Sequence, residues 1–368
     1  MAKTYLNVPA AKVLKVKELV ERTMDGDRIA KEMFVEGMAT SDMPIAFGAL
    51  VNGNLLNQYP VTPKIWPEFA SRKLVQDFRN VTYFDVFQDL SNLEGKQATS
   101  GDAYAGGLPV VPELSPYQTI GITENHTNFA VKKRGVQLGF SWEQLKNDTY
   151  GVLDQVIPQL AVLAANTEDI AATAALTSGV TSATQITTGN GYAASNPVLS
   201  LDALQKAIAN IQARRIGGRQ VIATHFKLIV PPSLYQTALN ILHTTERWTT
   251  NGSNQDHYTI DVGNVDVVLD NWFSTVLNSN AGTSWYVVPA VDDTFGRPSV
   301  IQAFLAGYET PEFRVGGMEG GQYAIGGADV PWQEGSFDND ALSFRLRVVG
   351  GSGFISENAV AWSSGAGS

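Results

Sequence analysis

The side chains that most often carry out chemistry are scarce in this chain of 368 residues, and their spacing builds no familiar reactive site. The four histidines are His126, His225, His243 and His257, and none has a second histidine at the spacing that zinc proteases use. The absence of cysteine excludes disulfides, thiolate metal sites and cysteine nucleophiles. We therefore expect no metal site, no cofactor and no catalytic residue.

The remaining motif candidates are more typical of turns than of binding loops. The run from Gly316 to Gly321 has the glycine content of a phosphate loop but no helical pattern after it. The acidic runs Asp292-Asp293 and Asp338-Asn339-Asp340 lack the spacing of a calcium-binding EF-hand. The formal net charge of −10 argues against a general nucleic-acid binder, although it does not exclude a protein that encloses nucleic acid.

Two arginines near the C-terminus are better candidates for binding than for catalysis. The run Ser343–Val349 alternates like a strand, with its apolar residues on one face and Arg345 and Arg347 on the other. An arginine fork at such a position suits a carboxylate of a neighbouring molecule. A solvated strand face explains the same pattern equally well.

The longest element follows the segment FSWEQLKND, in which Asp148 is predicted to be the helix N-cap. Small and apolar residues recur in steps of three and four from Val152 to Ala174, and the pattern ends at Gly179. About 28 residues at roughly 1.5 Å each predict a rod of about 42 Å. Because Pro158 lacks a backbone donor, we expect a kink near Asp154 or two abutting segments.

A long hairpin precedes this helix in the sequence. Strand-like alternation occurs at Val81–Val86, Tyr117–Thr123 and Asn128–Val131, and the segment 91–116 between them is dominated by Gly, Pro, Ser and Ala. A basic run, Lys132-Lys133-Arg134, follows. A connection of this length without its own core indicates a functional arm, and its strand edges need a partner.

The flanking regions predict an N-terminal arm and an α/β lobe. The first 67 residues contain two helical patterns, Val13–Met24 and Arg28–Met38, and then an apolar segment that is expected to pack on something. After the long helix we expect a helix capped by Ser200, a central strand His225–Val230 and a second helix begun by Pro232. Further strands are expected at Val265–Leu269, Ser284–Val288, Ser299–Phe304 and Ala359–Trp362. No apolar run is long enough to span a bilayer, so we expect a soluble intracellular product.

In this order of parts, and in the segments FSWEQLKND, KLIVPPSLYQTALNIL and SFRLRVV, the chain resembles major capsid proteins of tailed bacteriophages with the Hong Kong 97-type fold. The resemblance implies an α+β fold with an N-terminal arm, an extended β-hairpin loop, a long spine helix, and peripheral and axial domains. It implies the following division: arm and apolar interface segment 1–80, peripheral-domain strand and extended loop 81–140, spine helix 141–181, axial domain 182–335, and returning strands of the peripheral domain 336–368.

The resemblance implies a structural protein and not an enzyme. It would self-assemble through pentamers and hexamers into an icosahedral shell enclosing the double-stranded DNA genome of a tailed phage, located in the virion capsid and, during assembly, in the host cytoplasm. Scaffold, portal and decoration proteins are expected as further partners, with no sequence-specific DNA binding and no membrane. The expected intersubunit contacts are Glu94, Lys96, Asp102, Arg345 and Arg347.

Two other functions stay open at this point. An encapsulin, a bacterial nanocompartment shell of the same fold, is the first alternative, and the Gly/Pro-rich hairpin and long N-terminal arm favour the phage protein over it. A soluble α/β enzyme is the second alternative. It would need a convergent polar site, and the motifs supply none.

Overall fold

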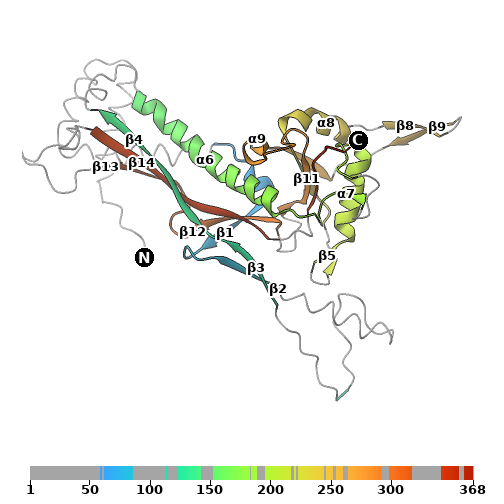
Figure 1. The fold of residues 1–368 in the computed structure, drawn as a ribbon, viewed down its shortest axis with the longest axis horizontal. Helices are drawn as coiled ribbons and strands as arrows, with labels where there is room; N and C mark the ends of the chain where they lie inside the picture. Colours follow the sequence, from blue (N-terminus) through green and yellow to red (C-terminus); the bar gives the residue numbers. More distant parts are fainter. Residues whose placement is uncertain are drawn as a thin grey trace, which may run out of the picture. The chain divides into compact units, whose positions relative to one another are not determined.

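The computed structural model describes residues 59, 62–85, 113–114, 123–141, 152–182, 184–188, 195–216, 219–220, 223–243, 246–251, 254–259, 264–291, 298–316, 341–355 and 360–367 (Figure 1). The chain divides into two compact units. The first unit comprises Met1–Pro63, Lys133–Asn166 and Gly307–Val349, and the second comprises Lys64–Lys132, Thr167–Ala306 and Gly350–Ser368. The two helices predicted before residue 40 and the N-cap Asp148 lie outside the described residues.

The long helix, α6, runs from Val152 to Gly179 without interruption (Figure 1). The prediction of two abutting segments is therefore wrong, because one lost hydrogen bond is small beside the rest of a 28-residue helix, whereas the kink near Asp154 stays a prediction. Pro158 is exposed, so the carbonyl of Asp154 that loses its partner can bind water. The predicted end is confirmed, and any side chain at Gly179 would collide with the ring of Phe354.

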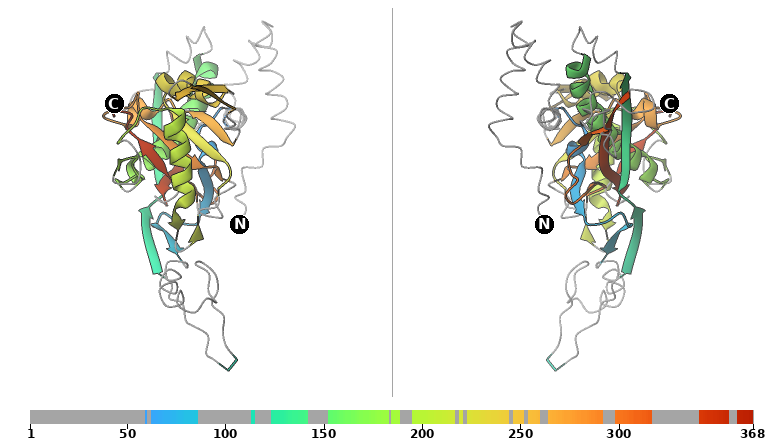
Figure 2. Two further views of the ribbon diagram at one scale, coloured as in Figure 1. Left: turned by 90° about the vertical axis from the view of Figure 1, so that its right-hand side faces the viewer. Right: turned by 90° about the vertical axis from the view of Figure 1, so that its left-hand side faces the viewer.

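In the first unit, strands cover one side of the first half of α6. Strand β14 (Ala341–Phe354) pairs with β13 (Glu312–Gly316) in antiparallel register and also with β4 (Lys132–Ser141), and the paired ribbons can be followed in Figure 2. The predicted inward face of β14 is confirmed. The core of the first unit consists of Tyr59, Leu160, Ala161, Ala164, Leu346 and Val348, with Val136, Leu138 and Phe313 packed against it.

In the second unit, a four-stranded sheet has the order β10-β7-β11-β15. The central position predicted for β7 (Phe226–Val230) is confirmed, since it pairs with β10 (Val265–Leu269) in parallel and with β11 (Trp285–Pro289) in antiparallel register. The last strand is β15 (Ala361–Ser363). Helices α7 (Leu201–Ala213) and α8 (Pro232–Leu242) begin where the sequence predicts, and the Ser200 hydroxyl accepts a hydrogen bond from the backbone N–H of Ala203 at 3.3 Å.

A second core of this unit lies between the sheets and the second half of α6. Strand β1 (Ala70–Val75) pairs in parallel with β12 (Val300–Leu305), which pairs in antiparallel register with the end of β14. Two short helices, η1 (Trp66–Glu68) and α9 (Phe273–Val276), complete it. Its large aromatic residues are Trp66, Phe69, Phe273, Tyr286 and Phe304.

Three pairs of strands stand apart from these sheets. Strand β2 (Val81–Asp85) pairs with β3 (Thr123–Phe129), so the base of the predicted hairpin is confirmed, whereas residues 86–112 and 115–122 lie outside the described residues. The other pairs are β5 (Arg215–Ile216) with β6 (Arg219–Gln220), and β8 (Glu246–Asn251) with β9 (Asn254–Thr259).

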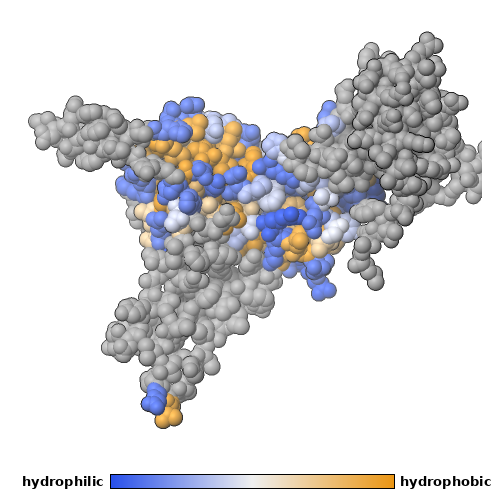
Figure 3. Space-filling view, turned by 180° about the vertical axis from the view of Figure 1, so that it is seen from behind, coloured by the Kyte–Doolittle hydropathy of each residue, from blue (hydrophilic) through white to orange (hydrophobic). Residues whose placement is uncertain are grey.

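Most large apolar residues of the described part lie inside. Those with an exposed fraction of 45% or more are Leu74, Phe78, Leu114, Val162, Leu163 and Val198. Figure 3 shows apolar residues interspersed with polar ones on the face seen from behind. Among the described residues, no helix combines the length and hydrophobicity needed to cross a membrane.

Candidate assembly surface

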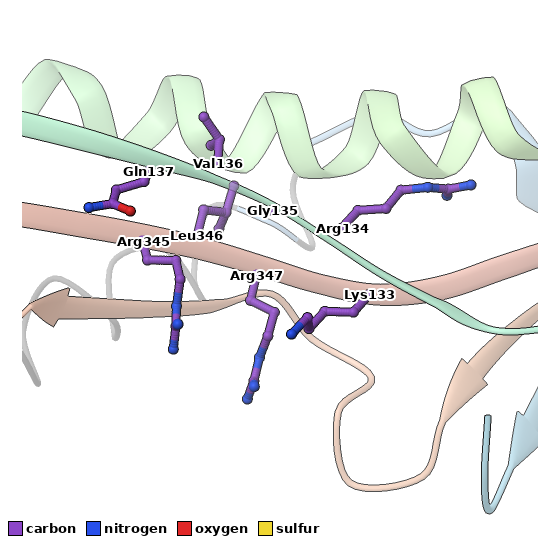
Figure 4. A pocket seen from close by; sticks show the side chains of 8 residues that line it. All are labelled: Lys133, Arg134, Gly135, Val136, Gln137, Arg345, Leu346 and Arg347. Carbon is purple, nitrogen blue, oxygen red and sulfur yellow. The ribbon is translucent and has the colours of Figure 1, made fainter.

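The sheet face of the first unit that points away from α6 is polar and cationic. Because successive strand residues alternate between faces, the inward positions of Leu346 and Val348 place Arg345 and Arg347 on the opposite face. Figure 4 shows the side chains of Lys133, Arg345 and Arg347 directed to the same side of β4 and β14, away from α6. The outward direction predicted for both arginines is therefore confirmed.

These side chains line a shallow groove of about 380 Å³. Its lining residues are Lys133, Arg134, Gly135, Val136, Gln137, Arg345, Leu346 and Arg347. Gly135 allows the two strands to approach, because a Cβ atom there would lie 2.5 Å from the carbonyl oxygen of Leu346. We call this feature the cationic groove, since four of its eight lining residues carry a positive charge and none carries a negative one.

The side chain of Arg347 is held in place by Glu312 of β13 and by the ring of Tyr308. Its Nη2 atom donates a hydrogen bond to Oε2 of Glu312, which lies directly opposite in the strand register. Its guanidinium carbon lies 5.2 Å from the centre of the Tyr308 ring. The Nε atom is buried and has no hydrogen-bond partner among the described residues. A donor of Arg347 is thus left over after Glu312 is bound.

The electrostatics of the groove favour an additional anion. Partial burial would raise the pKa of Glu312, but hydrogen bonds from Arg314 and Arg347 outweigh this effect and lower its pKa below the usual value. Arg345 lies directly opposite Arg314 in the register, so two positive charges face each other across β13 and β14. Arg345 is exposed and has no ion-pair partner in the described part of the chain. Acidic groups from outside would relieve this repulsion.

The other expected contact residues, Glu94, Lys96 and Asp102, lie outside the described residues. The structure therefore brings together Arg345 and Arg347, and it adds Lys133 and Glu312, which were not among the expected contact residues. The basic run that contains Lys133 indicated charge, but the strand β4 that carries it to the groove was not predicted.

A buried acidic cluster in the second unit was also missed. Glu168 and Asp169 of α6 and Asp270 after β10 have exposed fractions of 1%, 3% and 0%. The Asp169 carboxylate accepts hydrogen bonds from the backbone N–H groups of Ile65 and Trp66, each at 3.0 Å. Two adjacent carboxylates in an otherwise apolar half-helix were the available signal.

Further polar contacts satisfy the rest of this cluster. Oε2 of Glu168 accepts from the Trp66 indole at 3.0 Å and lies 3.3 Å from Nζ of Lys64. Asp270 accepts from the Thr173 hydroxyl at 2.6 Å and from the backbone N–H of Trp272 at 2.8 Å.

Burial raises the pKa of both Asp169 and Asp270 and lowers the pKa of Lys64. In the described part of the chain, no group of three His, Asp or Glu side chains could hold a metal ion. The cluster anchors the chain before β1 to α6.

Solved structures of phage capsids and of an encapsulin resemble this chain at low sequence identity. The mature capsid of bacteriophage PhiM1 is 10% identical, with 82% of this chain and 86% of that chain covered and a TM-score of 0.48. The capsid of cyanophage P-SCSP1u is 12% identical, with 82% and 88% covered and a TM-score of 0.46. The holo encapsulin complex of Synechococcus elongatus is 9% identical, with 80% and 85% covered and a TM-score of 0.45. No curated protein sequence matches.

The sequence model of the family described as phage capsid protein matches residues 124–363. This range covers the described residues from β3 to β15. The expected α+β capsid fold of the Hong Kong 97 type and the structural role in a capsid shell are thereby confirmed. Because the match spans well over half of its length, the chain belongs to the phage capsid protein family.

Proposed function

We propose that this chain is the subunit of an icosahedral shell that assembles through five-fold and six-fold rings and encloses the double-stranded DNA genome of a tailed phage. The observation that carries the proposal is the family match over residues 124–363. Heterologous contacts between identical copies close into rings, and rings can close further into a shell. The role is structural, so we infer that the chain catalyses no reaction.

The cationic groove supports one specific intersubunit contact. The segment 86–122 carries four carboxylates, including Glu94 and Asp102, against the single Lys96. The groove of the first unit carries a surplus of positive charge in a chain whose net charge is −10. We infer that the acidic segment of one copy binds over the cationic groove of the next copy, where the exposed guanidinium of Arg345 binds its carboxylates.

Each such contact is weak, and repetition makes the shell stable. Exposed ion pairs contribute about 0–1 kcal/mol each. A subunit in a ring binds at least two neighbours, so the second contact forms at high effective concentration. The five-part division of the chain, from the arm 1–80 to the returning strands 336–368, belongs to this proposal. So do scaffold, portal and decoration proteins as partners and the host cytoplasm as the place of assembly.

Electron microscopy of the full-length recombinant chain tests the proposal. We expect pentamers, hexamers or closed shells in negative stain. Monodisperse monomers that form none of these, even with a scaffold protein present, would contradict it. The encapsulin alternative is separated by the contents of particles from the native source: nuclease-protected double-stranded DNA supports the phage shell, and an enzyme cargo supports the encapsulin.

A further inference from the structure

The hairpin formed by β8 and β9 has no sheet partner in the described part of the chain. Its strands, Glu246–Asn251 and Asn254–Thr259, pair over six successive positions without a bulge. Figure 1 shows the two arrows extending side by side beyond α8 of the same unit. A two-stranded hairpin alone is marginally stable in water, so this one is expected to gain stability from a further partner.

Both edges of the hairpin are open to further strands. The connection between Asn251 and Asn254 has two residues, so the pair nearest the turn is hydrogen-bonded and alternate pairs follow. The backbone groups of Trp248 and Thr250 on β8, and of Gln255 and His257 on β9, then point outward. Neither strand contains proline or lysine, the residues that most often protect an edge from pairing.

Pairing of the β8 edge of one copy with the β9 edge of another satisfies more backbone groups than pairing of two like edges. A two-fold contact would join β8 to β8 and leave both β9 edges open. A head-to-tail contact joins β8 of one copy to β9 of the next, and in a closed ring it leaves no edge unpaired. Because the strands of one hairpin are antiparallel, the new pairing is antiparallel as well.

Charge complementarity favours the same arrangement. Within the hairpin no charged residue faces another charged residue: the pairs are Glu246–Thr259, Arg247–Tyr258, Trp248–His257 and Thr249–Asp256. A stagger of two residues between copies keeps each residue on its face and places Arg247 opposite Asp256 of the next copy. The same stagger places Glu246 opposite His257 of the next copy. Closing a sheet into a barrel requires a stagger of this kind.

We propose that the β8–β9 hairpins of all copies in one ring join edge to edge, β8 of each copy against β9 of the next, into a closed antiparallel sheet. The partner is a second copy of this chain, recognised by backbone hydrogen bonds and by the Arg247–Asp256 pair across each junction. The inference rests on the proposed function, since it requires that copies form rings.

Charge reversal in trans tests the junction. The variants Arg247→Asp and Asp256→Arg each place like charges at every junction, and we expect either one to lower the yield of rings and shells at least about tenfold. When the two variants are mixed in equal amounts, alternating copies around a six-membered ring restore opposite charges at every junction. After mixing, each variant chain still carries like charges at its own positions 247 and 256. Recovery on mixing therefore reports a contact between chains.

Asn254→Asp is the matched control. It adds a negative charge to the same hairpin, and the stagger places it opposite Thr249 of the next copy, so we expect a yield within about twofold of the wild type. Amide exchange in the wild type gives a second measurement. The outward amides of Trp248, Thr250, Gln255 and His257 should exchange about tenfold more slowly in rings than in dissociated subunits.

The outcomes separate this inference from the proposed function. The inference is overturned if the outward amides of wild-type rings exchange as fast as those of free subunits. It is also overturned if the single variants assemble normally. Either outcome leaves the shell proposal standing. Failure of the mixture to recover would likewise place the Arg247–Asp256 contact within one chain. A wild-type chain that forms no ring or shell overturns both.

Discussion

At the residue scale, Glu312 is the carboxylate that organises the cationic groove. Its lowered pKa means that the folded state binds fewer protons than the unfolded state, so the group adds stability above its unfolded pKa and loses it as the pH falls through the folded pKa. We expect Glu312→Gln to lower the free energy of unfolding by about 0.5–1 kcal/mol near neutral pH, because the pair is partly exposed. The difference from wild type, measured by urea denaturation, should vanish in acid. A pH-independent difference would contradict this account.

For Asp270 we expect the opposite dependence of folding stability on pH. Burial raises its pKa, so between the unfolded and folded values the folded state binds more protons, and stability increases as the pH falls through the folded pKa toward the unfolded one. Asp270→Asn keeps an acceptor for the Thr173 hydroxyl but cannot titrate. We expect the variant to lack this acid-side gain in the same denaturation series. Asp77→Asn, an exposed carboxylate, is the control and should follow the wild type.

At the element scale, the sequence predicts those helices and strands in which the spacing of apolar residues matches the face that is buried. The helix α7 with its Ser200 cap and the inward residues of β14 are examples. Strand β4 escaped prediction because Lys132-Lys133-Arg134 and two glycines weaken its apolar alternation, and pairing with β14 supplies what its propensity lacks. The acidic cluster was missed because its partners Ile65 and Trp66 lie about a hundred residues away in the sequence.

Pro158 lies inside α6 although proline generally breaks or kinks a helix. The helix continues through it, so the lost hydrogen bond and the ring's steric strain remain inside an intact α6. We expect Pro158→Ala to raise the free energy of unfolding by about 1–3 kcal/mol, since alanine restores the donor and adds helix propensity. Gln159→Ala, the exposed neighbour, should change it by less than about 0.5 kcal/mol. Thermal denaturation in which Pro158→Ala is no more stable than this control would show that the proline is unstrained.

At the scale of the whole molecule, assembly through the cationic groove should respond to charge and to salt more strongly than folding does. Arg345 has no ion-pair partner in the described part of the chain, so Arg345→Glu should leave the fold intact while weakening the groove contact of every copy in the ring. A loss of about 1 kcal/mol per contact, repeated around a ring, should raise the concentration needed for assembly at least about tenfold.

Light scattering across a concentration series would measure this threshold, with Lys206→Glu on α7 as the control of equal charge change. Raising the ionic strength from about 0.1 M to about 1 M shortens the screening length from about 10 Å to about 3 Å, so the wild-type threshold should rise with salt. The threshold of Arg345→Glu should rise much less, because the attraction that salt screens is already gone. Equal salt dependence in the two proteins would mean that the groove binds no acidic neighbour and that other surfaces hold the shell together.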